Sequence, residues 1–403
     1  MILPKAMGPT FSKPGTPPAV MIVGGGPFQL PLVEAAQGLG LAICVVDRDP
    51  CAPAMMLADV PMAIDFGSPE LVVRAAAHMP LSAVATCGSD AALRAVNAVA
   101  EAHGLVAPCG VEVCADKMLT AHALECAGVP HPESWALPTE RDFDGPWVVK
   151  PRRGAGGRGV TVVRSVEEVP DAVHVVRALG AIPFAQRWVG GHPVGVELMM
   201  LDGQVAGAWV MDDVLRPGFA APVAHTLPSA LDEATQTEII EVAASAARAV
   251  GLGSGPANLD MRLTDDGPVV LEINPRLGGS NISALIKHAT GVDLPRATLL
   301  WALDRDPRPA LKGSGRSRGA SSRLILAEGD GIVRWPSSPP ERAGVTVHVD
   351  VPSERPAPQQ VGQWSILGRC VAVGEDAHTA AALAEQVTDQ LEADIDLITR
   401  EGP

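Results

Sequence analysis

The segment VVLEINPRLGGS, residues 269 to 280, contains the residue types that most directly predict chemistry. Glu272, Asn274 and Arg276 occupy alternate positions at the end of an apolar strand, so we expect them to share one face. Carboxylate and amide oxygens are ligands for a hard cation such as Mg²⁺, and the arginine adds a fixed positive charge. The Gly-Gly pair that follows predicts a turn with exposed backbone N–H groups. The segment therefore predicts a site for a cation and an anion.

A second strand, in the segment NLDMRLTDDG, carries Asp260. Asp266-Gly267 is a favoured hairpin turn, and we expect it to bring Asp260 beside Glu272. Two neighbouring carboxylates with an asparagine and an arginine suit a Mg²⁺ ion that bridges phosphate groups. Acidic residues at a strand edge are often only solvated, however. A phosphate-binding loop elsewhere in the chain would favour the metal site.

A glycine-rich loop in WVVKPRRGAGGRGV, residues 147 to 160, is the candidate phosphate-binding loop. Lys150 ends an apolar strand, and three arginines add positive charge in an otherwise acidic chain. The loop runs from strand to strand, whereas a Walker loop runs from strand to helix. Glycines leave backbone N–H groups accessible to phosphate oxygens. The alternative is a flexible hairpin with solvated arginines. The glycines of the loop are Gly154, Gly156, Gly157 and Gly159.

An earlier glycine cluster, IVGGGPFQLP at residues 22 to 31, lies between a predicted strand and a predicted helix. Asp47 ends the next strand, where a dinucleotide-binding domain places its ribose-binding acid. The dinucleotide fingerprint is incomplete, because Gln29 replaces its third glycine. We therefore expect a Rossmann-like domain whose glycine turn contacts a different small ligand or none, with NAD or FAD binding as the weaker alternative.

The composition limits the class of protein. The chain has 403 residues, enough for two or three domains, and a net charge of −15 disfavours nucleic acid and membrane as partners. Seven cysteines without a C-x-x-C pair indicate reduced thiols. The proline-rich N-terminus is atypical of a signal peptide, and no apolar run approaches the roughly 20 residues that span a bilayer. These features predict a cytoplasmic protein.

Strands alternate with helices from residue 19 onward, which favours a parallel sheet in an α/β fold. Residues 1 to 18 are expected to form a disordered leader, and residues 304 to 319 a linker or mobile loop. Asp202-Gly203 predicts a second hairpin. Helices are predicted at residues 30 to 38, 90 to 103, 115 to 130, 166 to 179, 232 to 250, 282 to 303 and 377 to 393.

Taken together, the glycine hairpin and the paired-carboxylate strand about 120 residues later resemble the ATP-grasp superfamily, from about residue 20 to 400. The tail LGGSN resembles most the L-amino-acid ligases, which make dipeptides. The resemblance implies a Rossmann-like preATP-grasp domain at 19–115, a small β-rich lid domain at 116–190, and a larger α+β domain at 191–403. It also implies ATP and magnesium, with two ions for which Mn²⁺ can substitute.

The resemblance also implies roles for individual residues. Arg276 matches the arginine that stabilises the acyl phosphate, and Asp260, Glu272 and Asn274 match magnesium ligands. His225 is assigned to substrate or phosphate contact, with an ordinary loop histidine as the alternative. Glu197 either replaces a missing ribose-binding glutamate or only orients the sheet. The residues implied to bind nucleotide are Lys117, Lys150, Gly154, Gly156, Gly157, Gly159, Gln186, Trp188, Val189 and Glu197. Those implied to bind substrate are His225, Gly278, Gly279 and Ser280.

The expected activity is ATP-dependent formation of an acyl phosphate from a small carboxylate, followed by coupling to an amine with release of ADP and phosphate. The small-molecule carboxylate and amine are then the partners, and the resemblance also allows a homodimer. Two alternatives stay open. One is a carboxylase that uses bicarbonate, and the other is a non-catalytic sensor that binds nucleotide.

Overall fold

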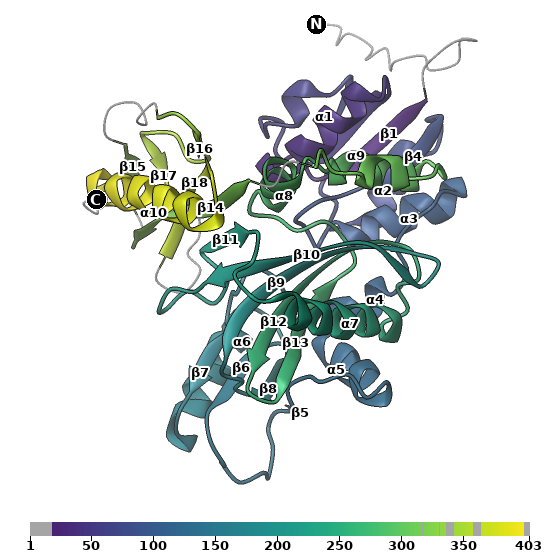
Figure 1. The fold of residues 1–403 in the computed structure, drawn as a ribbon. Helices are drawn as coiled ribbons and strands as arrows, with labels where there is room; N and C mark the ends of the chain where they lie inside the picture. The colour runs from purple at the N-terminus through teal and green to yellow at the C-terminus, as the bar shows by residue number, and fades with distance from the viewer. Residues whose placement is uncertain (1–17, 316–317, 330, 336–341, 358–363, 399–403) are drawn as a thin grey trace, which may run out of the picture. The chain divides into compact units, whose positions relative to one another are not determined.

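The computed structural model describes residues 18–315, 318–329, 331–335, 342–357 and 364–398 (Figure 1). Residues 1 to 17 of the predicted leader and residues 316 and 317 of the predicted linker lie outside this part. The chain divides into two compact units. One contains the chain up to Ala107 together with Pro295–Pro309, and the other contains Pro108–Leu294 together with Ala310–Pro403. Each unit is described by itself.

The first unit is built on a parallel sheet of order β3-β2-β1-β4. Every residue of β1 is buried, as expected for a parallel strand covered on both faces. This arrangement confirms the predicted Rossmann-like sheet. The elements are β1 Ala19–Val23, η1 Pro27–Gln29, α1 Leu30–Gly38, β2 Ala42–Asp47, η2 Met55–Leu57, β3 Val60–Ala63, α2 Pro69–Ala76, β4 Leu81–Ala85 and α3 Leu93–His103.

The second unit begins with a helical pair and a small sheet of order β5-β8-β6-β7. The helix predicted over 115–130 is confirmed as the second helix of the pair, which begins at Lys117 and ends at Cys126, ahead of Gly128. Asp116 separates it from the short first helix. Asp116 has an extended backbone, and its carboxylate caps the second helix. The elements are α4 Val111–Ala115, α5 Lys117–Cys126, β5 Ser134–Ala136, β6 Trp147–Pro151, β7 Thr161–Val163, η3 Val166–Glu168, α6 Val169–Ala178 and β8 Pro183–Arg187.

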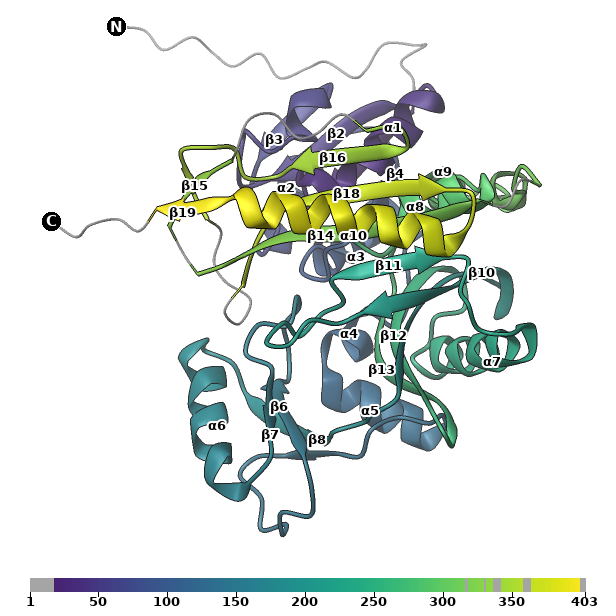
Figure 2. The same ribbon diagram turned by 60° about the vertical axis from the view of Figure 1, so that its left-hand side comes forward.

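An eight-stranded sheet of order β13-β12-β9-β10-β11-β14-β18-β16 forms the centre of the second unit (Figures 1 and 2). Its strands are β9 His192–Leu201, β10 Gln204–Val214, β11 Ala224–Leu227, β12 Gly255–Thr264, β13 Gly267–Asn274, β14 Gly319–Glu328, β16 Val345–Val349 and β18 Trp364–Gly374. A three-stranded sheet of β15 Ile332–Arg334, β17 Arg355–Pro356 and β19 Asp396–Ile398 accompanies it.

Helices of this unit include α7 Glu233–Ala249, α8 Ile282–Thr290 and α10 Ala377–Asp394. The single helix predicted over 282–303 is wrong, because α8 ends at Gly291 in the left-handed conformation and α9 Leu294–Ala302 is a separate helix. The predicted linker holds a short helix, η4 Arg308–Leu311, and its last residue already belongs to β14. Among the described residues, no helix combines the length and apolar character of a membrane span.

Helix α7 packs on one face of the central sheet and sets the direction of the side chains on β9, β12 and β13 (Figure 1). Val196, Leu259 and Ile273 belong to the apolar cluster that α7 closes. Because side chains alternate along a strand, the neighbouring Glu197 and Asp260 are expected on the opposite face. The fold thereby directs a row of polar residues away from the α7 core.

Candidate functional site

The two strands that carry the predicted carboxylates are hydrogen-bonded neighbours. Asp260 of β12 lies directly opposite Glu272 of β13, which confirms the predicted juxtaposition. The turn itself is made by Asp265 and Asp266, one residue earlier than predicted, because Thr264 already pairs with Gly267. The register shifts after Asp260–Glu272, since Met261 pairs with Val270, and a bulge of this kind re-aims the side chains beside it.

Two lysines approach Glu272 from outside the central sheet. Lys117 Nζ, at the start of α5, lies 3.1 Å from Glu272 Oε1 and donates to the carbonyl of Gly154 at 2.7 Å. Burial lowers the pKa of Lys150 to about 8, although Glu272 and Asp260 raise it. Burial would raise the pKa of Glu272, but Lys117 and Lys150 hold it below its ordinary value. The structure thus brings both predicted phosphate lysines to the predicted metal ligands.

Asp260 is half-buried, and other carboxylates lie near it. Burial, the nearby Glu272 and Asp213 raise the pKa of Asp260 to about 7. A divalent cation would remove that repulsion, so the donor set fits Mg²⁺. In the described part of the chain, no three His, Cys, Asp or Glu side chains are arranged to hold a metal. Two carboxylates and Asn274 would therefore need phosphate oxygens to complete the coordination.

A buried network fixes the loop after β13. Glu197 of β9 is fully buried and accepts the Gly278 N–H at 3.0 Å, and Asn258 Nδ2 donates to it at 3.2 Å. Arg276 Nη1 donates to Asn258 Oδ1 at 3.2 Å. A Cβ on Gly278 would lie 2.8 Å from Glu197 Oε2, so this position requires glycine.

These contacts change the roles expected for Gly278 and Glu197. The Gly278 N–H was expected to face substrate, but here it donates to Glu197. Burial raises the pKa of Glu197 to about 8, which suits a side chain enclosed by protein. The contacts favour the second of its two predicted roles, orientation of the sheet and the following turn. Asn258 was missed, although it alternates with Asp260 on the same strand.

His225 is also buried, and it belongs to the same sheet. Its Nδ1 lies 2.6 Å from Asp213 Oδ1, and the two residues face one another across β11 and β10. Burial lowers the pKa of His225, yet Asp213 and the more distant Asp260 and Glu197 raise it above its ordinary value overall. Asp213 was missed by the sequence interpretation, because its partner lies on another strand.

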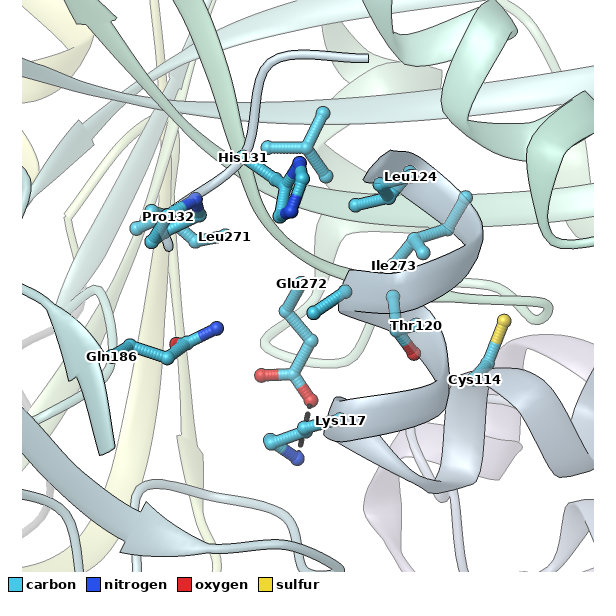
Figure 3. A pocket seen from close by; sticks show the side chains of 12 residues that line it. Cys114, Lys117, Thr120, Leu124, His131, Pro132, Gln186, Leu271, Glu272 and Ile273 are labelled. Atoms are coloured by element: carbon cyan, nitrogen blue, oxygen red, sulfur yellow. Dashed lines mark ion pairs between the residues drawn. The ribbon is translucent and has the colours of Figure 1, made fainter. Parts of the chain in front are cut away.

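A small pocket lies between α5 and the end of β8 (Figure 3). Gln186 lines it and donates through Nε2 to Ser134 Oγ at 2.9 Å. Trp188 is not among the lining residues and is 44% exposed. The lining residues are Cys114, Lys117, Thr120, Ala121, Leu124, His131, Pro132, Gln186, Val270, Leu271, Glu272 and Ile273.

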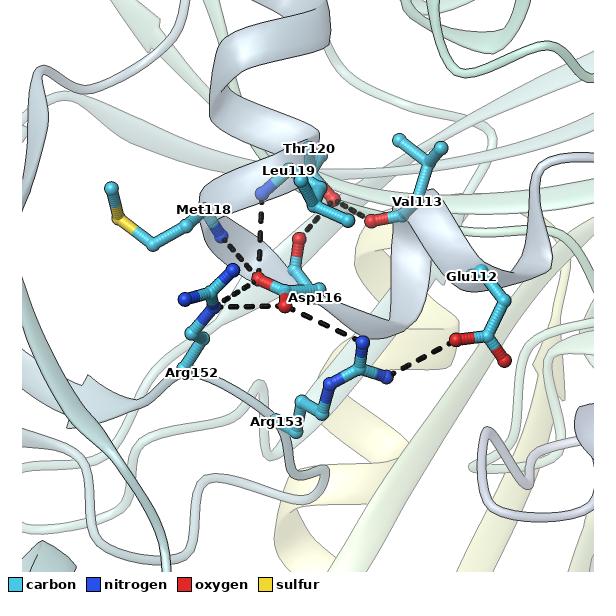
Figure 4. Close-up of polar contacts among 8 residues, drawn as sticks. All are labelled: Glu112, Val113, Asp116, Met118, Leu119, Thr120, Arg152 and Arg153. Carbon is cyan, nitrogen blue, oxygen red and sulfur yellow. Dashed lines mark hydrogen bonds and ion pairs between the residues drawn. The ribbon is translucent and has the colours of Figure 1, made fainter.

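Asp116, another residue that the sequence interpretation missed, caps the helix α5 that begins at Lys117, and Figure 4 shows its contacts. Its carboxylate accepts the Met118 N–H at 3.1 Å and both its oxygens accept from Arg152 Nε at 2.7 and 2.8 Å. Arg153 pairs with Asp116 and Glu112, each at 3.4 Å. Arg152 and Arg153, expected to supply charge to phosphates, are therefore bound to acidic residues in this structure.

Comparison with known proteins shows what this part of the chain is similar to. Residues 114–280 match the model of an ATP-grasp domain. The chain is 31% identical to carnosine synthase 1 of Gallus gallus over 198 residues, 45% of this chain and 21% of that protein. It spans about half the length, or less, of the first curated relatives that it matches.

Solved structures show the same fold over nearly the whole chain. An L-amino acid ligase from Bacillus licheniformis superposes with a TM-score of 0.78 at 22% identity, covering 95% of this chain and 99% of that one. Biotin carboxylase from Campylobacter jejuni superposes with a TM-score of 0.72 at 19% identity, covering 94% and 92%. These matches confirm the predicted ATP-grasp fold, and at such identities they show the fold alone.

Proposed function

We propose that this chain is an ATP-dependent ligase that couples a small carboxylate, an amino acid, to an amine, because residues 114–280 match the model of an ATP-grasp domain. The carboxylate attacks the γ-phosphorus of ATP and forms an acyl phosphate, with ADP as the leaving group. The amine then attacks the acyl carbon, the carbon–oxygen bond to phosphate breaks, and an amide forms. Phosphorylation is needed because a free carboxylate has no adequate leaving group.

The observation that carries this proposal is the meeting of two lysines with a paired carboxylate. Lys117 contacts both Glu272 and the first glycine of the loop, and Lys150 is buried beside them. Lysines so placed neutralise the charge that develops on a transferring phosphoryl group. Bound Mg²⁺ would polarise the same phosphate oxygens, and Asp260, Glu272 and Asn274 are the residues that would hold it. Two ions, with Mn²⁺ as a substitute, are part of the proposal.

The rest of the nucleotide site is assigned to the lid. The loop that carries Gly154, Gly156, Gly157 and Gly159 closes over the phosphates with its backbone N–H groups and excludes water, which would hydrolyse an acyl phosphate. Gln186 accepts from the adenine amino group through Oε1. The backbone of Trp188 and Val189, which follow Gln186 in the chain, contacts the same adenine edge.

Arg276, with Gly279 and Ser280 after it, is assigned to the acyl group. The guanidinium is held in place by Asn258 and the Leu277 carbonyl, so it is preorganised to stabilise the oxyanion of the tetrahedral intermediate. The names of the relatives support amide formation, since carnosine synthase and L-amino acid ligase both join amino acids. Bicarbonate is the main competing substrate, because a biotin carboxylase domain of the same fold was solved with bicarbonate bound.

Release of ADP from MgATP tests the reaction class. With a pool of the twenty proteinogenic amino acids, turnover is expected only when a carboxylate and an amine are both available, and mass spectrometry should find an amide. ADP release that depends on bicarbonate instead would replace the ligase with a carboxylase. Nucleotide binding without turnover on any pool would favour a sensor.

Arg276→Ala tests the central assignment of the mechanism. Because Arg276 acts on the acyl group rather than on the nucleotide, ATP affinity should stay within about threefold while turnover falls by roughly 10²–10³-fold. Isothermal titration with a non-hydrolysable ATP analogue and the ADP assay measure the two quantities. A collapse of nucleotide affinity would show that Arg276 binds the phosphates instead.

A further inference from the structure

Asp213 and His225 form a buried hydrogen-bonded pair near the site, and the proposed nucleotide contacts give this pair no role. The two residues are partners across β10 and β11, with Nδ1 and Oδ1 2.6 Å apart. Gly195 makes room for this pair, because a Cβ there would lie 3.0 Å from Asp213 Oδ1. Gly195 is also the β9 partner of Asp260. One strand, β9, therefore separates Asp213 from the predicted metal ligand Asp260.

A second contact joins His225 to the loop after Arg276. The β14 partner of His225 is Ser322, and Ser322 Oγ donates to the carbonyl of Ser280 at 2.6 Å. His225 thus lies one residue from the turn assigned to the acyl group. Its Nδ1 is engaged by Asp213, and its Nε2 has no hydrogen-bond partner among the described residues.

The second half of the proposed reaction requires a base. An amine reaches the site largely as an ammonium ion at neutral pH, and an ammonium ion has no lone pair with which to attack. Lys117, Lys150 and Arg276 are positioned to neutralise negative charge, not to accept a proton. Asp260 and Glu272 are the residues that would hold the cation, and Glu197 is enclosed by Asn258 and Gly278.

We propose that His225 is the general base that takes a proton from the amine substrate, and that Asp213 is its positioning residue; this rests on the proposed ligase function. Nε2 removes one proton from the ammonium group. The freed lone pair forms the carbon–nitrogen bond, the carbon–oxygen bond to phosphate breaks, and phosphate leaves with the second proton. His225 then returns its proton to solvent. Asp213 accepts from Nδ1–H and so holds the tautomer whose Nε2 can accept.

The surroundings set the working pH of this base. The charged groups that act on His225 are Asp213 from β10, Glu197 from β9 and Asp260 from β12, while the neighbouring strand β14 contributes the uncharged Ser322. All three carboxylates favour the imidazolium and raise the pKa of His225 against the effect of burial. The imidazole is thereby matched more closely to an amine that must be deprotonated near neutral pH.

A nucleophile that needs no base separates this role from the alternatives. Hydroxylamine is neutral at pH 7 and traps acyl phosphates as hydroxamates. With MgATP and the pool of twenty amino acids, His225→Gln should still form hydroxamates within about twofold of the wild-type rate. Formation of amides from the same pool without hydroxylamine should fall by at least about 10²-fold. Asp213→Asn should likewise retain hydroxamate formation, while its rate of amide formation should fall by about tenfold or more.

The matched control is His192→Gln. His192 is exposed and lies 3.8 Å from Asp212 Oδ1, so it forms a second histidine–aspartate pair on the same sheet. Asp212 and Asp213 are consecutive on β10, so their side chains point to opposite faces of the sheet. Both rates of His192→Gln should equal those of the wild type. Equal loss of hydroxamate and amide in His225→Gln would overturn the base and assign His225 to phosphate contact. Unchanged amide formation would also overturn it. Absence of any hydroxamate from the wild type would instead overturn the proposed ligase.

The amide rate of the wild type should also rise with pH to a plateau set by His225. In His225→Gln the rise should continue about tenfold per unit, until the amine itself is neutral. In Asp213→Asn, the amide rate should not reach a plateau at the pH where the wild-type rate does. A profile in His225→Gln that parallels the wild-type profile at every pH would contradict the proposed proton transfer.

Discussion

Two glycine-rich loops of this molecule each follow a buried strand, and their surroundings differ. The loop at Gly24–Gly26 follows β1, and the Gly25 N–H donates to Asp47 Oδ2 at 2.7 Å. A Cβ on Gly25 would lie 2.9 Å from Asp47 Cβ and 3.0 Å from Ala52 Cβ. Asp47, which stands where a ribose-binding acid would, is thus engaged within its own domain. This loop is closed by packing.

The loop at Gly154–Gly159 follows β6 and is open over its first half. A Cβ on Gly156 would meet nothing within 4 Å, and one on Gly154 would meet only Pro151 at ordinary contact distance. The lysine beside it, Lys117, already bonds to its backbone. The same residue type therefore serves close packing in one loop and access in the other. The side chains around a glycine loop, rather than the glycines, decide whether it can receive a ligand.

Of the variants that test this difference between the loops, Lys150→Met should have the largest effect on activity, because it removes the buried charge beside the open loop. We expect kcat/KM for ATP to fall by roughly 10²–10³-fold, the loss typical of one group that stabilises transition-state charge. The melting temperature should not fall, since a buried ammonium is replaced by an apolar side chain of similar length. ADP release and thermal unfolding measure the two effects.

Lys287→Met is the control for that experiment. Lys287 is exposed and pairs with Asp293 at 2.9 Å on the surface of α8, and such pairs contribute little to stability. Its kcat/KM should match that of the wild type. A Lys150 variant with normal kcat/KM would show that the open loop is merely a hairpin with solvated charges.

Gly25→Ala tests the closed loop, where we expect a loss of stability and not of activity. The added Cβ meets two other Cβ atoms that cannot rotate away, so we expect unfolding to become easier by about 1–3 kcal/mol. Gly38→Ala, at the end of α1 in the same unit, is the control, because its Cβ would meet only Arg296 Nη1 at 3.9 Å. Chemical denaturation measures both. Equal stability of the two variants would mean that the first loop is as open as the second.

The pH dependence of ATP binding tests whether Lys150, beside the open loop, meets the phosphates. The pKa of Lys150 in the free protein is about 8, so the charge that attracts phosphate is lost as pH rises through that value. ATP affinity should fall by up to about tenfold per unit above pH 8. Stability should change in the other direction, because the unfolded chain, with a lysine pKa of 10.5, holds the proton longer and the cost of burying the charge disappears.

Calorimetric titration with a non-hydrolysable ATP analogue between pH 7 and 9.5 measures this dependence. Lys150→Met should abolish it, and Lys287→Met should leave it unchanged. An affinity that stays constant across this range in the wild type would show that Lys150 does not meet the phosphates.

The sequence predicts those parts of the site that depend on local pattern. Alternation along two strands and a short turn were enough to place Asp260 beside Glu272. The hairpin at Asp202-Gly203 follows from the same rule, and both residues adopt the positive φ that the turn requires. Periodicity also predicted α1 over residues 30 to 38.

What the sequence could not predict depends on contacts between distant segments. Asp213 meets His225 through strand register, and Asn258 joins Glu197 to Arg276 across a sheet order that no local pattern encodes. Asp116 caps α5 and also accepts a hydrogen bond from Arg152, 36 residues later, a contact that no local pattern indicates. Each of these residues is a polar partner of a predicted one, so the missing information is spatial rather than chemical.

Gly156→Ala should have the smallest effect and separates the two loops most finely. Its positive φ costs an alanine about 1 kcal/mol wherever the conformation is enforced, but no side chain packs against this position to enforce it. The open loop can therefore relax, and unfolding should change by less than about 0.5 kcal/mol. Closure over phosphates would enforce the conformation again, so KM for ATP should rise severalfold. A stability loss as large as that of Gly25→Ala, with KM unchanged, would make the second loop structural, like the first.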